Sequence, residues 1–142
     1  MIKAILVDAG GVLYLNDSGK GYINPSLLEF IKSNKNRYLF GVISQTDLDL
    51  KNVLERNGVI SLFKLVLTSG ETGMHKGDTE IYKKALAILN LKPEEVIFID
   101  NQNTYREAAS SLGIKTILYD GNREDNFHSC KEQIDQILAR EN

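Results

Sequence analysis

The stretch that decides the fold runs from Ile2 to Val12 and reads IKAILVDAGGV. Its aliphatic residues stand at consecutive positions, which is typical of a strand buried on both faces of a parallel sheet. Asp8 ends the apolar run, and Gly10 and Gly11 favour a sharp turn directly after it. Because ligands gather beyond the carboxyl ends of parallel strands, Asp8 is expected at a binding site. On this stretch alone, an ordinary strand-ending turn explains Asp8 equally well.

The rest of the chain alternates between strand and helix patterns. Short apolar runs predict further strands at 38–43, 65–67, 96–99 and 114–119. Apolar residues at helical spacing predict helices near 24–34, 47–57, 78–89 and 104–113, and a closing helix around 134–138. This alternation predicts an α/β fold with a parallel five-stranded sheet and helices on both faces. We expect one domain over residues 1–142, with a small flap at about 12–23.

Composition excludes several classes of protein. Charged residues make up 25% and apolar residues 42% of the chain, and 17 basic against 19 acidic residues give a net charge of -2. A basic stripe is missing, so nucleic-acid binding is not expected. The sequence has neither a signal-like leader nor an apolar run of the ~20 residues that a membrane span needs. We therefore expect a protein of the cytoplasm.

Cysteine and histidine are too few for a disulfide or a zinc site. Cys130 is the one cysteine, which rules out an intrachain disulfide and fits a reducing compartment. His128 and His75 are the two histidines, and a structural zinc ion needs four nitrogen or sulfur ligands. We interpret Cys130 as a residue of helix packing.

Polar residues follow four of the five predicted strands. Asp8, Ser44 and Asp100 come directly after strands, and Lys76 lies in the loop after the third strand. Each has an ordinary explanation when taken alone, as a turn residue, a helix cap or a solvated charge. Together they form a set of groups that can act on a phosphate.

With these residues in place, the sequence resembles the haloacid dehalogenase superfamily of hydrolases, most of which are phosphatases. The matching segments are LVDAGGVL at 6–13, VIS at 42–44, GMHKGD at 73–78 and VIFIDN at 96–101, the last followed by EAA at 107–109. The resemblance covers essentially the whole chain. It implies a three-layer Rossmann-like fold in which the strands, numbered along the chain, lie in the order 5-4-1-2-3. Asp8 and Asp100 would then face one another on adjacent strands.

The resemblance also implies the roles of the catalytic and phosphate-binding residues. Asp8 would attack phosphorus and form an aspartyl-phosphate. Ser44 and Gln45 would bind the phosphoryl oxygens, and Lys76 would neutralise charge beside Asp8. These roles suit phosphoryl transfer, which depends mainly on positioning and on stabilisation of charge. The expected substrate is a phosphorylated molecule, small or macromolecular.

A magnesium ion is the cofactor that the resemblance implies. Two adjacent carboxylates repel each other, and a hard cation with oxygen ligands relieves that repulsion. The implied ligands are the carboxylates of Asp8 and Asp100 and the backbone carbonyl of Gly10. Asn101 would orient the metal or a water bound to it.

Two departures from the family pattern bear on activity. Phosphatases of the family carry a second Asp two residues after the nucleophile as general acid and base, and this chain has Gly10. Such a group contributes about 10² to 10⁴ in rate, and Asp17 in the flap is one candidate to replace it. The large cap that many relatives insert after the first motif is also missing. The site should be open, and a large substrate or a second copy of the chain could cover it.

Four other functions fit the sequence less well. A weakly active or inactive relative that binds a phosphorylated ligand or a protein partner is the main alternative, because of Gly10. A phosphoacceptor receiver domain needs its acceptor after the third strand, where this chain has Thr68 and Ser69. Hydrolysis of a carbon-halogen bond tolerates Gly10, but a capless site encloses a small organic acid poorly. Nucleotide-binding glycine loops are excluded because neither of their spacings occurs.

Overall fold

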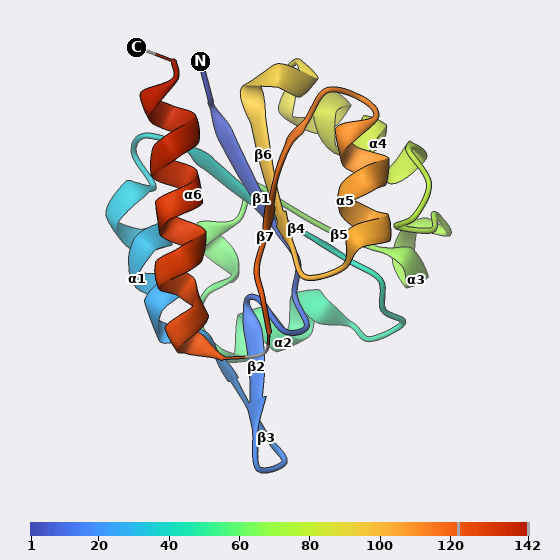
Figure 1. Cartoon of the computed structure of the whole chain (residues 1–142). Helices are drawn as coiled ribbons and strands as arrows, with labels where there is room; N and C mark the ends of the chain where they lie inside the picture. Colours follow the sequence, from blue (N-terminus) through green and yellow to red (C-terminus); the bar gives the residue numbers. More distant parts are fainter. Residues whose placement is uncertain (122, 142) are drawn as a thin grey trace.

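The central sheet of the computed structural model has five parallel strands, and the structure describes residues 1–121 and 123–141. Its order is β5-β4-β1-β6-β7 (Figure 1). The bounds of these strands are Ala4–Val7 for β1, Leu39–Ser44 for β4, Leu65–Thr68 for β5, Val96–Asp100 for β6 and Lys115–Leu118 for β7. Numbered along the chain, this is the predicted order, and the Rossmann-like α/β fold is confirmed.

The strand of the opening motif lies at the centre of this sheet. Val7, the last residue of β1, stands opposite Val42 of β4 and Ile99 of β6. The residues that follow these three positions along their strands are Asp8, Ile43 and Asp100. The carboxyl ends of β1 and β6 therefore bring their two carboxylates to the same edge of the sheet.

Helices cover both faces of the sheet (Figure 1). On one face lie α1 (Pro25–Asn34), α2 (Leu50–Arg56) and α6 (Phe127–Ala139), and on the other lie α4 (Glu80–Leu89) and α5 (Asn103–Ser110). A short helix, α3 (Ser69–Thr72), follows β5. Ile5 and Val7 pack into the first of two apolar clusters, and Ala4 and Leu6 pack into the second. Successive side chains of a strand point to opposite faces, so β1 is buried on both.

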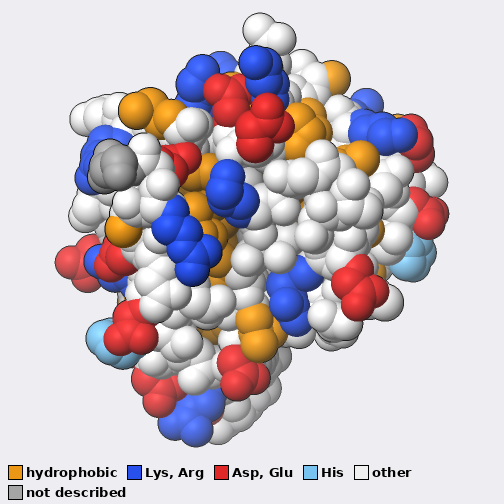
Figure 2. Space-filling view, turned by 45° about the horizontal axis from the view of Figure 1, so that its top comes forward, with side chains coloured by type: hydrophobic (Ala, Val, Ile, Leu, Met, Phe, Trp, Pro, Cys, Tyr) orange, Lys and Arg blue, Asp and Glu red, His pale blue; other side chains and the backbone are white. Residues whose placement is uncertain are grey.

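Between β1 and α1 the chain forms a hairpin of β2 (Tyr14–Asp17) and β3 (Lys20–Ile23). The hairpin projects from the body of the molecule, as the first two figures show (Figure 1 and Figure 2). Asn24 fixes its base, because the buried Nδ2 of Asn24 donates to the Val12 carbonyl at 3.0 Å and to the Tyr119 hydroxyl at 2.8 Å. The same residue caps α1, whose first turn contains Pro25.

Several helix starts differ from the sequence prediction; α4, for example, begins at Glu80 instead of residue 78, and α6 begins at Phe127 instead of residue 134. Helix α2 begins at Leu50 instead of residue 47, because the Asp49 side chain caps it by accepting from the Asn52 N–H at 3.2 Å. Leu48 therefore lies in the preceding turn and is 69% exposed. Helix α5 begins at Asn103, one residue before the predicted start at residue 104.

The surface carries charges of both signs, as the balanced composition predicts. Lys and Arg side chains are interspersed with Asp and Glu side chains over the face in Figure 2. Within residues 1–121 and 123–141, no helix has both the length and the apolar character that crossing a membrane requires.

Candidate active site

Lys76 lies at the centre of a buried cluster of charges. Its side chain is fully buried, and its Nζ lies 2.6 Å from Asp8 Oδ1 and 2.6 Å from Asp100 Oδ2. A lysine is almost never fully buried unless its charge is paired. The ring centres of Phe98 and Tyr105 lie 5.3 Å and 4.9 Å from Nζ, within the range of a cation–π contact. The structure thus brings together three residues that are far apart in the sequence.

Backbone contacts hold the loop that carries Lys76. The Lys76 N–H donates to Gln45 Oε1 at 2.7 Å, and the Lys76 carbonyl accepts from the Tyr82 hydroxyl at 2.7 Å. Gln45 therefore links the end of β4 to the lysine loop. The role of Tyr82 was not predicted from the sequence, because it occupies an apolar position of a helix. A buried tyrosine needs a partner for its hydroxyl group, and that requirement is the signal that could have indicated it.

Burial raises the pKa of Asp8 to about 6, from an ordinary value of 3.8. Loss of hydration is the main cause, since Asp8 is 6% exposed. The positive charge of Lys76 lowers the pKa, and the negative charge of Asp100 raises it. One lysine is shared between two carboxylates, so the three groups carry a net charge of −1 when all are ionised.

Asp100 lies deeper than Asp8 and is fully buried. Its Oδ1 accepts from the Gln102 N–H at 2.8 Å. Its Oδ2 forms the ion pair with Lys76, but the pair lacks hydrogen-bond geometry, and this oxygen has no hydrogen-bond donor within the described ranges. Asn101 bridges the two carboxylates: with its amide nitrogen turned toward them, it donates to Asp8 Oδ2 and to Asp100 Oδ1, each at 3.1 Å.

The oxygen atoms around Asn101 are of the kind that magnesium prefers, but together they carry little negative charge. The amide group lies beside one oxygen of Asp8 and one of Asp100, and with its own oxygen turned inward it would complete a set of hard donors. Magnesium prefers oxygen ligands and keeps several waters. Over residues 1–121 and 123–141, no group of three or more His, Cys, Asp or Glu side chains could hold a metal. A magnesium ion held here would need its remaining ligands from the Gly10 carbonyl, the Asn101 amide and water.

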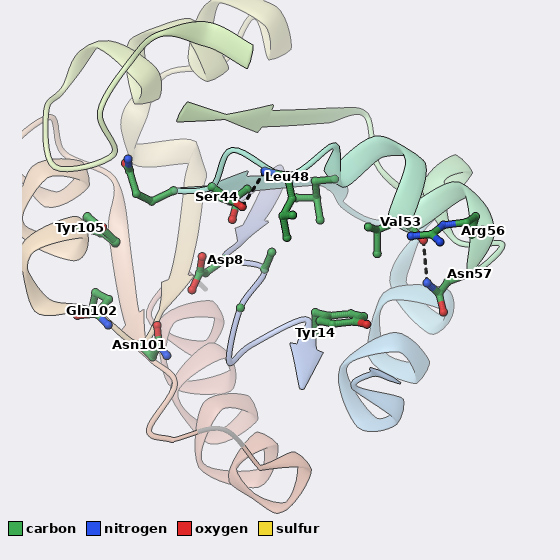
Figure 3. A pocket seen from close by; sticks show the side chains of 15 residues that line it. Asp8, Tyr14, Ser44, Leu48, Val53, Arg56, Asn57, Asn101, Gln102 and Tyr105 are labelled. Carbon is green, nitrogen blue, oxygen red and sulfur yellow. Dashed lines mark hydrogen bonds between the residues drawn. The ribbon is translucent and has the colours of Figure 1, made fainter. Parts of the chain in front are cut away.

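A cavity of about 620 Å³ opens over these residues (Figure 3). Its lining comes from the loop after β1, the end of β4, helix α2 and the start of α5, and comprises Asp8, Ala9, Gly10, Tyr14, Ser44, Gln45, Thr46, Leu48, Leu50, Val53, Arg56, Asn57, Asn101, Gln102 and Tyr105. Ser44, the last residue of β4, is buried beside Asp8 in this lining. Lys76 and Asp100 lie beneath the floor, because neither is among the lining residues.

The two glycines after Asp8 have different surroundings. A Cβ atom at Gly10 would meet nothing within 4 Å. Gly11 has a φ of +82°, and a Cβ atom there would come within 2.6 Å of the Asn101 side chain. Gly11 is therefore required by the backbone, whereas Gly10 leaves open space in the cavity lining.

Asp17 lies away from the cavity. It is the exposed last residue of β2, near the tip of the hairpin, and is not among the lining residues. Asp8 is the one carboxylic acid that lines the cavity within the part of the chain that the structure describes.

Comparison with known proteins identifies a family that this chain matches. Residues 21–119 match the family described as haloacid dehalogenase-like hydrolase. An uncharacterized hydrolase of Schizosaccharomyces pombe is 35% identical over 88 residues, which are 56% of this chain and 39% of that protein. A ribulose-1,5-bisphosphate 5-phosphatase of Halopiger xanaduensis is 32% identical over 74 residues, which are 51% of this chain and 31% of that protein. The chain thus matches well under half the length of these two relatives.

One solved structure shows the same fold. A haloacid dehalogenase family enzyme of Bacteroides thetaiotaomicron, as the wild-type protein in complex with magnesium and inorganic phosphate, superposes with a TM-score of 0.73 at 18% identity, over 87% of this chain and 96% of that one. The family match spans more than half of the chain, and the strand order agrees with it. This chain therefore belongs to the haloacid dehalogenase-like hydrolase family.

Proposed function

We propose that this protein is a magnesium-dependent phosphate-monoester hydrolase that uses Asp8 as its nucleophile. The observation that carries the proposal is the position of the Asp8 carboxylate, at the floor of an open cavity and in contact with a fully buried lysine. Relatives support this chemistry: one is named as a phosphatase, and one solved structure of the same fold holds magnesium and phosphate.

In the proposed reaction, a carboxylate oxygen of Asp8 attacks phosphorus while the bond to the ester oxygen breaks. The leaving oxygen departs with the bonding electron pair as an alkoxide or phenolate, which takes its proton from water. A second water then hydrolyses the aspartyl-phosphate, which releases inorganic phosphate and restores the Asp8 carboxylate. Lys76 holds Asp8 Oδ1 at 2.6 Å and thereby fixes the direction of the carboxylate. Ser44 and Gln45, which line the same cavity, are the proposed contacts of the phosphoryl oxygens. Positioned charges of this kind supply much of the rate of phosphoryl transfer.

The proposed ligands of magnesium are Asp8, the Gly10 carbonyl and Asp100, with Asn101 orienting the metal or a bound water. When bound, magnesium would shield the negative charge of the phosphoryl group from Asp8. Asp100 accepts from the Gln102 N–H and pairs with Lys76. Besides acting as a ligand, it would thus hold Lys76 in place against Asp8.

The missing acid at position 10 determines which esters react. Without a general acid the leaving group must depart unprotonated, so phenols should leave far more readily than alkanols. The direct test is hydrolysis of p-nitrophenyl phosphate with magnesium by the wild type and by Asp8→Asn. We expect activity that EDTA abolishes and that the Asp8→Asn variant lacks. Equal rates in both proteins would contradict the proposal.

A second candidate function follows from the open space at Gly10. If turnover requires the general acid and base that the family carries at position 10, this protein binds a phosphorylated ligand with little or no turnover. Gly10→Asp tests this function, because a Cβ atom fits there without a clash, and Gly10→Asn is the control of equal size without the acid. Phosphatase activity that appears in Gly10→Asp, but in neither the wild type nor Gly10→Asn, would favour an inactive wild-type protein. A wild type as active as Gly10→Asp would favour the hydrolase.

A further inference from the structure

The cavity extends well beyond the space that a phosphoryl group needs. If each of the five heavy atoms of phosphate takes about the volume of a water molecule in the liquid, ~30 Å³, the group fills about 150 Å³. The cavity measures about 620 Å³. The remaining volume holds roughly 15 further non-hydrogen atoms on the same assumption, and the whole cavity falls in the size range of small-molecule sites, about 300 to 1,000 Å³.

The middle of the cavity is apolar. Figure 3 shows Leu48, Tyr14 and Val53 between Asp8 on one side and Arg56 with Asn57 on the other. Leu48 comes from the turn before α2, Val53 from α2 itself and Tyr14 from the start of the hairpin. With 69% of its surface exposed, Leu48 gains from being covered by an apolar partner. A ligand body that lies on these three side chains would bury them.

The far end of the cavity carries a positive charge without a partner. Arg56 is the one cation among the lining residues, and its guanidinium forms neither an ion pair nor a hydrogen bond with any residue that the structure describes. On the same helix, Lys51 pairs with Glu71 at 2.8 Å. Asn57 stands next to Arg56, with its Nδ2 donating to the Val53 carbonyl at 2.7 Å. An arginine in the last turn of a helix is favourable on its own account, so a functional role needs its own test.

From these contacts we infer that the substrate is an aryl phosphomonoester with a second anionic group, whose apolar body lies on Tyr14, Leu48 and Val53 and whose far anion is bound by Arg56. The inference rests on the proposed function, because it places the phosphoryl group at Asp8. Arginine suits the second anion because its planar guanidinium can donate two parallel hydrogen bonds to a carboxylate or a phosphate. The aryl group follows from the missing acid at position 10, which favours phenols as leaving groups.

A pair of matched esters tests the inference. In 3-(4-phosphooxyphenyl)propanoate and 4-propylphenyl phosphate the leaving phenols are nearly equal, and the two differ mainly in the distal carboxylate. The wild type should have a KM about five- to tenfold lower for the carboxylate ester, with similar kcat for both. Remote binding that is equal in the ground state and the transition state changes KM alone.

Variants separate the two parts of the site. Arg56→Ala should remove the preference for the carboxylate ester, Arg56→Lys should restore part of it, and Lys51→Ala, a change of the same charge on the same helix, should leave it intact. Leu48→Ser should raise KM for both esters. Equal KM values in the wild type, or a preference that survives Arg56→Ala, would overturn the inference.

Binding separates this inference from the proposed hydrolase. The corresponding phosphonates, which cannot be hydrolysed, are titrated into the wild type and Arg56→Ala by calorimetry with magnesium present. A preference for the carboxylate phosphonate that Arg56→Ala abolishes would support the inference even if no ester turned over, and would then count against the hydrolase alone. Hydrolysis of both esters with no such preference would overturn the inference and leave the hydrolase standing. No binding of either phosphonate would overturn the inference as well.

Discussion

Replacing Lys76 by Met should destabilise the metal-free protein strongly, because the lysine is the one cation between two buried carboxylates. Its Nζ lies 2.6 Å from an oxygen of each. Methionine keeps the apolar length of the side chain and removes the charge. Removing one partner from a buried ion pair costs about 3 to 5 kcal/mol, mostly the cost of leaving a buried charge without a partner. We expect a loss of that size in the free energy of unfolding near pH 8.

The expected shift in Tm follows from the size of the chain. The entropy of unfolding is about 2.1 cal/mol/K per residue near 60 °C, which gives roughly 0.3 kcal/mol/K for 142 residues. A loss of 3 to 5 kcal/mol then lowers Tm by about 10 to 17 °C. The matched control is Lys84→Met on the exposed side of α4, for which a change within about 0.5 kcal/mol is expected.

The loss should depend on pH with a definite sign. The pKa of Asp8 is already raised in the folded protein to about 6, and removal of Lys76 takes away the charge that lowers it. A carboxyl group with a raised pKa favours the folded state below its unfolded pKa, near 3.8, and that contribution disappears as pH rises through the folded pKa. The penalty of Lys76→Met should therefore be small near pH 4 and full near pH 8. Adding Asp100→Asn to Lys76→Met should recover part of the stability.

Urea unfolding at pH 4.5, 6 and 8 in the presence of EDTA measures this dependence. A loss of the same size at every pH would refute the reasoning, because a purely steric defect does not titrate. A Lys76→Met protein as stable as the Lys84→Met protein at pH 8 would also refute it.

Three further outcomes are expected from the fold. The thiol of Cys130 is fully buried, and burial raises its pKa to about 12. DTNB at pH 8 should therefore react with it only after denaturant is added. Rapid reaction of the native protein would contradict the position of Cys130 in the core. Asn24→Ala should cost about 2 to 3 kcal/mol, because it leaves a buried carbonyl and a helix N–H without partners, which thermal unfolding measures. Gly11→Ala should lower the free energy of unfolding by about 1 to 3 kcal/mol, because Gly11 has a positive φ and lies close to Asn101. Gly10→Ala should change Tm little, since a Cβ atom there meets nothing. Equal shifts in Tm for the two variants would contradict this difference.

The fold could be predicted well because its signals are local. Consecutive apolar residues at 4–7 and 96–99 mark strands buried on both faces, and the helical spacing between strands leaves few arrangements other than a parallel sheet. The ends of helices were predicted less well. Helix α2 was expected to begin at residue 47, but Asp49 caps it; Asp47 and Asp49 are both good caps, and the choice depends on how the chain leaves β4. That small shift places Leu48 at the cavity instead of inside a helix.

The sequence could not predict which residues of the candidate site line the cavity and which lie beneath its floor. This layering depends on how deeply each side chain is buried in the folded protein. A lysine in a glycine-containing loop is usually solvated, yet Lys76 is fully buried, its backbone held by Gln45 and Tyr82 from two other segments. Asp100 and Asn101 are neighbours in the chain, but Asp100 lies beneath the cavity floor and Asn101 lines the cavity. The neutral residues Gly10 and Asn101 thus line the cavity, and the charges of Lys76 and Asp100 stand behind Asp8.

This layering bears on how strongly the site can hold a metal. Asp8, Asp100 and Lys76 together carry a net charge of −1, and Asn101 adds none. Cation affinity in oxygen sites rises with the number of charged ligands. A site with so little negative charge should bind magnesium weakly when empty and more strongly once a phosphorylated ligand adds its own charge. Metal and ligand should then bind with positive coupling, each raising the affinity for the other by the same factor.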